Sequence, residues 1–180
     1  MGTIFVAGSY GVGKSTLCEK LSHKMAIPFY SAGDIKSKVN GETYGANKVV
    51  SDKAVNQDIL SNEIKKILKI YPNILLAGHF CIFNKSNQVE YLPATVFSNL
   101  YIETILLLEA DPERIVRNLS TRDGKEYTVQ EIQELIAAEN AYAHKIAEGN
   151  SCPLLVYDMK FSESDVDFCL DMLSKEMSGK

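Results

Sequence analysis

The stretch Gly8-Ser9-Tyr10-Gly11-Val12-Gly13-Lys14-Ser15 decides how the chain folds. Its spacing, a glycine, four residues and then Gly-Lys-Ser, is that of the phosphate-binding P-loop. An apolar run at residues 3–7 precedes it, and Leu17, Leu21 and Met25 recur at helical spacing after it. A strand, a glycine-rich turn and a helix N-terminus are therefore predicted in the order that a phosphate site requires.

This stretch also predicts the chemistry of binding. Its glycines allow a tight turn whose backbone N–H groups point inward, and the helix N-terminus adds partial positive charge. We expect Lys14 to act on the outer phosphates as a catalytic group and the Ser15 hydroxyl to ligate Mg²⁺. The expected nucleotide-binding residues are Gly8, Ser9, Tyr10, Gly11, Val12, Gly13, Lys14, Ser15 and Thr16. A glycine turn in an ordinary βα unit is the alternative, which the flanking strand and helix disfavour.

The composition excludes several classes of protein. With 180 residues, 46% of them apolar and 23% charged, we expect a single P-loop kinase-like domain over residues 1–180. The net charge of -4 disfavours a nucleic-acid polymer or an anionic membrane as a partner, because a phosphate backbone needs a basic face. No signal peptide or membrane span is expected, so the protein is predicted to be cytoplasmic. Four widely spaced cysteines indicate small buried residues in a reducing compartment: Cys18, Cys81, Cys152 and Cys169.

Strands alternate with helices along the whole chain. Strands are predicted over residues 3–7, 27–30, 74–77, 101–108 and 154–157, and helices over 15–25, 35–39, 52–70, 93–99, 112–119, 128–146 and 162–177. This order predicts an α/β fold, a doubly wound five-stranded parallel sheet with helices on both faces. Ligands of such sheets bind at the carboxyl ends of the strands. Residues 78–92 show no regular period, and we expect a long functional loop there.

All three arginines of the chain lie within nine residues. A guanidinium group grips two phosphate oxygens at once, so arginines beside a polar turn favour phosphoryl transfer. We expect Arg117 and Arg122 to be catalytic and Arg114 to be a solvated helix residue. The alternative is that all three are solvated.

The order of motifs resembles nucleoside monophosphate kinases, and several short motifs are most similar to archaeal-type adenylate kinases. These motifs follow the P-loop at Ser31–Asp34, Leu75–His79, Tyr91–Pro93, Leu107–Glu113 and Ala141–Ala143. The resemblance covers residues 3–157, and the P-loop is its specific motif. It implies transfer of the ATP γ-phosphoryl to a small nucleotide or nucleoside. It also implies a short closing lid at about 117–128 and an acceptor-binding region at about 34–60 and 78–92.

Two residues depart from that family's pattern. Ala77 ends the third predicted strand, where the family usually has an acidic residue that organises Mg²⁺ through water. Asp34 follows the second strand, and we expect it to take over part of this metal role beside acceptor binding. Lys36 stands near the position where many members have an arginine for the acceptor phosphate.

Two further residues complete the expected acceptor site. His79 opens the 78–92 segment and is expected to contact the acceptor, although a buried, hydrogen-bonded histidine is the alternative. Gln57 is a weaker candidate for base recognition, because it fits a solvated helix face equally well. A protein partner remains possible, since the alternative function is a nucleotide-sensing ATP-binding module or weak ATPase that acts on another protein.

Overall fold

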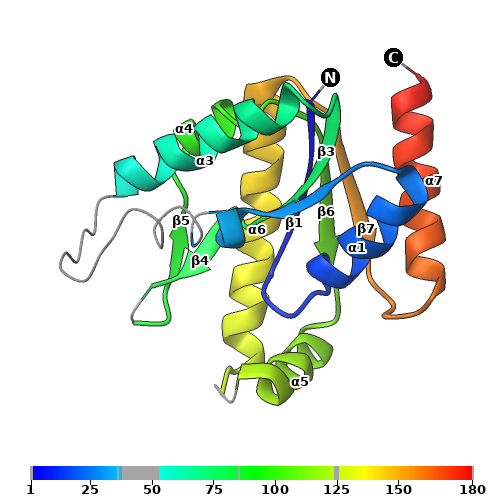
Figure 1. Cartoon of the computed structure of the whole chain (residues 1–180). Coiled ribbons are helices and arrows are strands. Elements are labelled where there is room, and N and C mark those ends of the chain that lie inside the picture. The colour runs from blue at the N-terminus through cyan, green and yellow to red at the C-terminus, as the bar shows by residue number, and fades with distance from the viewer. Residues whose placement is uncertain (1, 36, 38–52, 85, 124–125, 180) are drawn as a thin grey trace.

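The computed structural model describes residues 2–35, 37, 53–84, 86–123 and 126–179, without the side chains of residues 53–58, 122 and 123. Five strands form one sheet in the order β2-β3-β1-β6-β7, and every pair in it is parallel. They are β1 (Gly2–Gly8), β2 (Phe29–Ser31), β3 (Asn73–Ala77), β6 (Ile102–Glu109) and β7 (Leu154–Asp158). The predicted fold class and all five predicted strands are confirmed. Figure 1 shows the sheet at the centre, with helices on both sides.

Six helices with assigned bounds lie in the described part of the chain, and they cover the two faces of the sheet. They are α1 (Lys14–Met25), α3 (Lys53–Leu68), α4 (Ala94–Ser98), α5 (Pro112–Asp123), α6 (Val129–Asn150) and α7 (Ser164–Ser178), with one further helical turn at residues 32–35. Alternate residues of β1 face opposite ways. Phe5 packs in the core below α3, α4 and α6, and Val6 packs in the core below α1, α5 and α7. No helix among the described residues is long and apolar enough to cross a lipid bilayer.

Side-chain hydrogen bonds cap the N-terminal ends of two of these helices. The Thr128 hydroxyl accepts the Glu131 N–H at 3.1 Å, and the Glu131 carboxylate accepts the Thr128 N–H at 2.8 Å, which is a capping box at α6. Asp111 accepts the Arg114 N–H at 2.9 Å at the start of α5. Both helices lie beside the carboxyl ends of the strands, so these caps fix elements that border the site.

Two predictions about irregular segments are wrong. Residues 78–92 contain an antiparallel hairpin of β4 (Cys81–Phe83) and β5 (Val89–Tyr91), which the sequence did not reveal because three-residue strands are too short to show a period. The polar turn expected from Ser120 onward is helical to Asp123. Its hydroxyl groups bond back along the helix, since Ser120 donates to the Val116 carbonyl and Thr121 to the Arg117 carbonyl, both at 3.0 Å.

Candidate active site

The P-loop joins β1 to α1, and its backbone requires glycine at three positions. Gly8, Gly11 and Gly13 have φ angles of 140°, 73° and 96°, which side chains rarely tolerate. A Cβ atom on Gly8 would also lie 2.3 Å from the Leu108 carbonyl oxygen of β6. The Lys14 ammonium folds over this turn and donates to the carbonyls of Gly8 at 2.7 Å and Ser9 at 2.8 Å. The turn is therefore a closed cradle with a positive charge at its mouth.

Three cavities meet at this cradle, and shared residues connect them. The P-loop cavity, about 410 Å³, lies over residues 10–16 and reaches His79 and Asn118. On one side it shares Gly11, Gly13, Thr16 and Asn118 with a cavity of about 550 Å³, the β7-side cavity. On the other side it shares Lys14, Ser15 and His79 with a cavity of about 310 Å³, the β3-side cavity. The P-loop thus stands between two separate spaces.

The β7-side cavity is bounded by the loop that follows β7. Asp165, only 2% exposed, holds this loop by accepting the backbone N–H groups of Lys160 at 3.1 Å and Ser162 at 2.9 Å, and the Tyr157 hydroxyl at 2.9 Å. Burial, followed by the hydrogen bond to Asp165, raises the pKa of Tyr157 to about 12. Phe161, at the centre of this loop, has a left-handed φ of 57° and lines the cavity. This side therefore presents a fixed loop with one aromatic ring.

α5 packs against the P-loop. The Asn118 side chain donates to the Gly11 carbonyl at 3.0 Å, and a Cβ on Gly11 would lie 2.9 Å from Leu119 of the same helix. The helix and the P-loop are thus in direct contact. Asn118 also lines the P-loop cavity and the β7-side cavity, so α5 borders both of these spaces.

The β3-side cavity has a mostly apolar lining. Ser31, Ser15, Lys14 and His79 are its polar residues with side chains, and the others are Phe5, Ala32, Gly33, Leu60, Ala77, Gly78, Ile82, Leu92, Val96, Phe97 and Leu100. Three of these polar residues, Lys14, Ser15 and His79, also line the P-loop cavity, whereas Ser31 lies at the end of β2. The space can therefore enclose a small molecule by its apolar part and orient it by its polar part.

His79 lies where the two cavities join. Its ring packs against Tyr10 of the P-loop at a tilt of 39°, with 4.4 Å between ring centroids. Its Nδ1 atom lies 3.5 Å from Oε1 of Glu139, a residue of α6 that is only 2% exposed. Burial and the nearby Lys14 ammonium lower the pKa of His79, against the opposing effect of Glu139 and the Gly8 carbonyl. His79 is therefore a neutral imidazole at neutral pH.

The residues around the P-loop fit a magnesium ion held mainly by phosphates. Such an ion takes one or two protein oxygens and keeps several waters. Ser15 lines both the P-loop cavity and the β3-side cavity, so its hydroxyl is placed to be one ligand. Among the described residues no group of three or more His, Cys, Asp or Glu side chains forms a metal cage of its own. In addition, the buried Ser9 hydroxyl oxygen has no hydrogen-bond partner within the described part of the protein.

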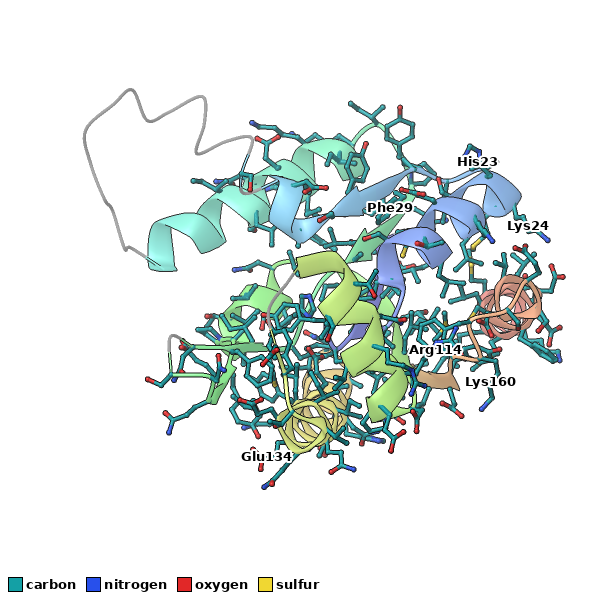
Figure 2. All side chains as sticks on the ribbon, turned by 90° about the horizontal axis from the view of Figure 1, so that it is seen from below. His23, Lys24, Phe29, Arg114, Glu134 and Lys160 are labelled. Atoms are coloured by element: carbon teal, nitrogen blue, oxygen red, sulfur yellow. The ribbon has the colours of Figure 1, made fainter. Side chains whose placement is uncertain are left out.

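Two other predicted site residues, Arg117 and Asp34, lie outside the three connected cavities. Arg117 is 65% exposed, lies 3.8 Å from Glu113 and lines a fourth cavity of about 680 Å³ rather than the P-loop cavity. Arg114 and Lys160 border that fourth cavity too and lie close together in Figure 2, which views the molecule from the α5 side. Asp34 is exposed, donates its N–H to Ser31 and is not among the residues that line the three connected cavities.

Three predicted residues cannot be placed in the site. Lys36 lies outside the described residues, and the side chains of Gln57 and Arg122 are not among those described. The backbone of Gln57 belongs to α3 and that of Arg122 to α5. Their proposed roles stay predictions.

Sequence reasoning missed three residues that shape the site: Asn118, Glu139 and Asp165. One of them carries a readable signal. The apolar stripe of α6 runs through Ile132, Leu135, Ala143 and Ile146, and Glu139 falls on it, where a charged residue is rare unless it has partners. The stretch Ser162–Asp165 is typical of a helix start, which indicates a cap at Asp165 but no part in the site, and Asn118 sits in an ordinary helical context.

Comparison with known proteins places the chain in a family. The family described as the AAA domain matches residues 7–136. A cytidylate kinase from Sulfolobus acidocaldarius is 29% identical over 98 residues, which cover 51% of this chain and 54% of that protein. The chain thus matches about half the length of this curated relative.

Solved structures support the fold. A shikimate kinase from Bacteroides thetaiotaomicron superposes with a TM-score of 0.60 at 17% identity, covering 98% of both chains. A sugar kinase from Janibacter gives a TM-score of 0.62 at 17% identity, covering 97% of this chain and 95% of that one. These likenesses confirm a P-loop kinase type of fold. They do not single out the archaeal-type adenylate kinases.

Proposed function

Because the chain belongs to the AAA domain family, we propose that it transfers the γ-phosphoryl group of ATP, with Mg²⁺, to a small acceptor. The observation that carries this proposal is the arrangement of the three connected cavities. The P-loop cavity joins a larger space on one side and a smaller, mostly apolar one on the other. A hydrolase needs only a water next to the γ-phosphate, whereas a kinase needs a second enclosed space.

The nucleoside of ATP is assigned to the β7-side cavity. The backbone N–H groups of the P-loop bind its phosphates, and Phe161 offers a ring for the base. Lys14, which now donates to two loop carbonyls, is close enough to turn to the outer phosphates. Mg²⁺, held at the Ser15 hydroxyl, would neutralise charge on the β- and γ-phosphates.

The acceptor is assigned to the β3-side cavity. Its volume of about 310 Å³ suits a nucleoside-sized or smaller group. The matched relatives are named for cytidylate, shikimate and sugars, so we expect a nucleotide, a nucleoside or a hydroxylated acid or sugar. A nucleotide or nucleoside is our first choice, since the curated relative is a cytidylate kinase. An adenylate-kinase-like activity is its finer form.

The lid and acceptor roles predicted from the sequence complete this proposal. Arg122, and with it Arg117, would approach the γ-phosphate when α5 moves, which also excludes water. Lys36 and Gln57 would contact the acceptor. Asp34 would orient waters on Mg²⁺ from the end of β2.

One observation favours a second function, a nucleotide sensor or weak ATPase that signals to a protein partner. Ala77 is buried at the end of β3 and borders the β3-side cavity, so no acidic group stands at that point to orient metal-bound water. Slow turnover would follow from this. The acceptor-side cavity itself favours the kinase.

A coupled assay separates the two functions. ATP, Mg²⁺ and a panel of nucleosides, nucleoside monophosphates, shikimate and sugars are supplied one by one, and ADP formation is followed. The kinase requires that one acceptor raises ADP formation well above the rate without acceptor. Release of inorganic phosphate that no acceptor changes would favour the sensor instead.

A further inference from the structure

We propose that Glu139 is a positioning residue that holds His79 as the Nδ1–H tautomer and so turns its Nε2 atom toward the junction of the P-loop and β3-side cavities. The positioning itself follows from contacts in the protein. Its consequence for turnover rests on the proposed kinase function. Nothing in the sequence motifs assigns a role to Glu139, which lies on α6, far along the chain from the P-loop.

The contacts of Glu139 clamp the segment that carries His79. Its two carboxylate oxygens each accept the Phe80 N–H at 3.1 Å, and Oε1 also accepts the Cys81 N–H at 3.2 Å. Both bonds are buried and link residues 58 and 59 positions apart in the chain. A carboxylate with two consecutive backbone donors cannot rotate freely, so its third approach, to His79, is fixed as well.

Two acceptors act on the ring, the Glu139 carboxylate and the Gly8 carbonyl, and the charged carboxylate is the stronger partner for the imidazole proton. Nδ1 of His79 is buried and lies 3.5 Å from Oε1 of Glu139, without a closer partner in the described part of the protein. A carboxylate is a pure acceptor, so a facing nitrogen is favourable only when it bears a hydrogen. A neutral imidazole protonated at Nδ1 has its lone pair on Nε2. The distance is longer than a hydrogen bond, as is common before substrates tighten a site.

Ring geometry then places the lone pair. With Nδ1 turned to α6, Nε2 points away from that helix, toward the cavities that His79 lines. Tyr10 packs against the ring from the P-loop side. Nε2 is therefore a hydrogen-bond acceptor for a donor group of the acceptor molecule, and its direction depends on Glu139.

Nitrogen NMR of the uniformly ¹⁵N-labelled protein tests the positioning without any assay of activity. The chain has three histidines, so His79→Asn identifies the His79 signals by their loss. We expect the wild-type His79 to show a protonated Nδ1 and an unprotonated Nε2. Glu139→Gln should shift both signals toward a mixture of tautomers. Asp165→Asn is the matched control, because it removes another buried carboxylate with two backbone donors, and it should leave the His79 signals in place.

A protonated Nε2 in the wild type, or His79 signals that Glu139→Gln leaves unchanged, would overturn the proposal. Should Glu139→Gln fail to fold, the wild-type spectrum alone decides. Turnover supplies the second arm. Loss of a residue that orients a site residue commonly costs ~10–100-fold, so Glu139→Gln should lower kcat by about that factor with an unchanged KM for ATP. In a His79→Asn background the same substitution should lower kcat no further, whereas equal losses in both backgrounds would mean a general structural role.

Discussion

The loops that follow β3 and β7 are built alike and do different work. Each is held by a buried carboxylate from a helix, Glu139 of α6 or Asp165 of α7, and each of these residues is 2% exposed. Asp165 accepts hydrogen bonds from two backbone N–H groups and from the Tyr157 hydroxyl. Glu139 accepts two backbone N–H groups as well, but its third neighbour is a histidine that borders two cavities.

Asp165 only holds its loop in place, whereas Glu139 also contacts a side chain that can act on a ligand. The network of Asp165 ends on the Tyr157 phenol, whose pKa burial raises to about 12, so this hydroxyl keeps its proton near neutral pH. The network of Glu139 ends on an imidazole whose other nitrogen faces the site. Under the proposed function, the β7 side would offer a surface for the nucleoside of ATP, and the β3 side would offer a directed polar atom for the acceptor.

The largest effect is expected from the removal of the Lys14 ammonium from the P-loop. Lys14 lines the P-loop cavity and the β3-side cavity, so Lys14→Ala should abolish most turnover, by ~10²–10³-fold, as for other charge-stabilising donors. Calorimetric titration with ATP and Mg²⁺ should also show weaker binding. Lys24→Ala is the control, because Lys24 lies on the same helix, is exposed, pairs with Asp167 at 2.5 Å and is not among the residues that line the three connected cavities. A folded Lys14→Ala protein with normal affinity and turnover would contradict the role of the P-loop.

A smaller effect distinguishes the two sides by pH. Since the pKa of His79 lies below its ordinary value of 6.5, kcat/KM should stay level as the pH falls to 6.5 and decline only below it. The carboxylate of Glu139 opposes this lowering, so Glu139→Gln should move the decline to still lower pH. Asp165→Asn should leave its position unchanged. A decline that begins above pH 6.5 would contradict a neutral His79.

The same titration makes a prediction about stability, with a sign that can be worked out. The folded protein binds fewer protons at His79 than the unfolded chain does between the lowered pKa and 6.5, so the free energy of unfolding should fall as the pH drops below 6.5. Urea unfolding of the wild type and His79→Asn measures it. The variant should lose less stability over this range, and equal slopes would exclude a contribution from His79.

The hydrogen bonds by which Asp165 holds the loop after β7 should contribute to the free energy of unfolding. Asp165→Asn leaves buried donors poorly matched, and we expect a loss of about 1.5–3 kcal/mol in the free energy of unfolding. Tyr157→Phe removes only one of the three bonds and should cost about 1 kcal/mol. Denaturant titration measures both. A cost for Tyr157→Phe as large as that for Asp165→Asn would mean that the phenol, rather than the loop, is what Asp165 holds.

The sequence predicted the fold well because its signals are local. The spacing of Gly8, Gly11 and Gly13 predicts a turn that other residues rarely adopt. The apolar segments before and after this turn are long enough to show the period of a strand and of a helix. The β4–β5 hairpin was missed because each of its strands has three residues. Boundaries, as at Ser120, depend on bonds within the helix that composition does not reveal.

The site was less predictable because it depends on contacts between distant segments. Glu139 meets Phe80 across 59 positions, and Asn118 meets Gly11 across 107. No pattern within either segment encodes such a meeting. His79 could be proposed because it follows a strand and therefore had to reach the edge of the sheet where the P-loop lies.

The most direct test of the account is whether the two sides bind different substrates. With the acceptor found by the panel assay, initial rates give KM for ATP and for the acceptor in two variants, one for each side. Phe161→Ala, in the β7-side cavity, should raise KM for ATP and leave KM for the acceptor unchanged; Ala32→Leu, which narrows the β3-side cavity, should do the reverse. If Phe161→Ala raises only KM for the acceptor, or if both variants raise both values equally, the assignment of ATP and acceptor to opposite sides of the P-loop is contradicted.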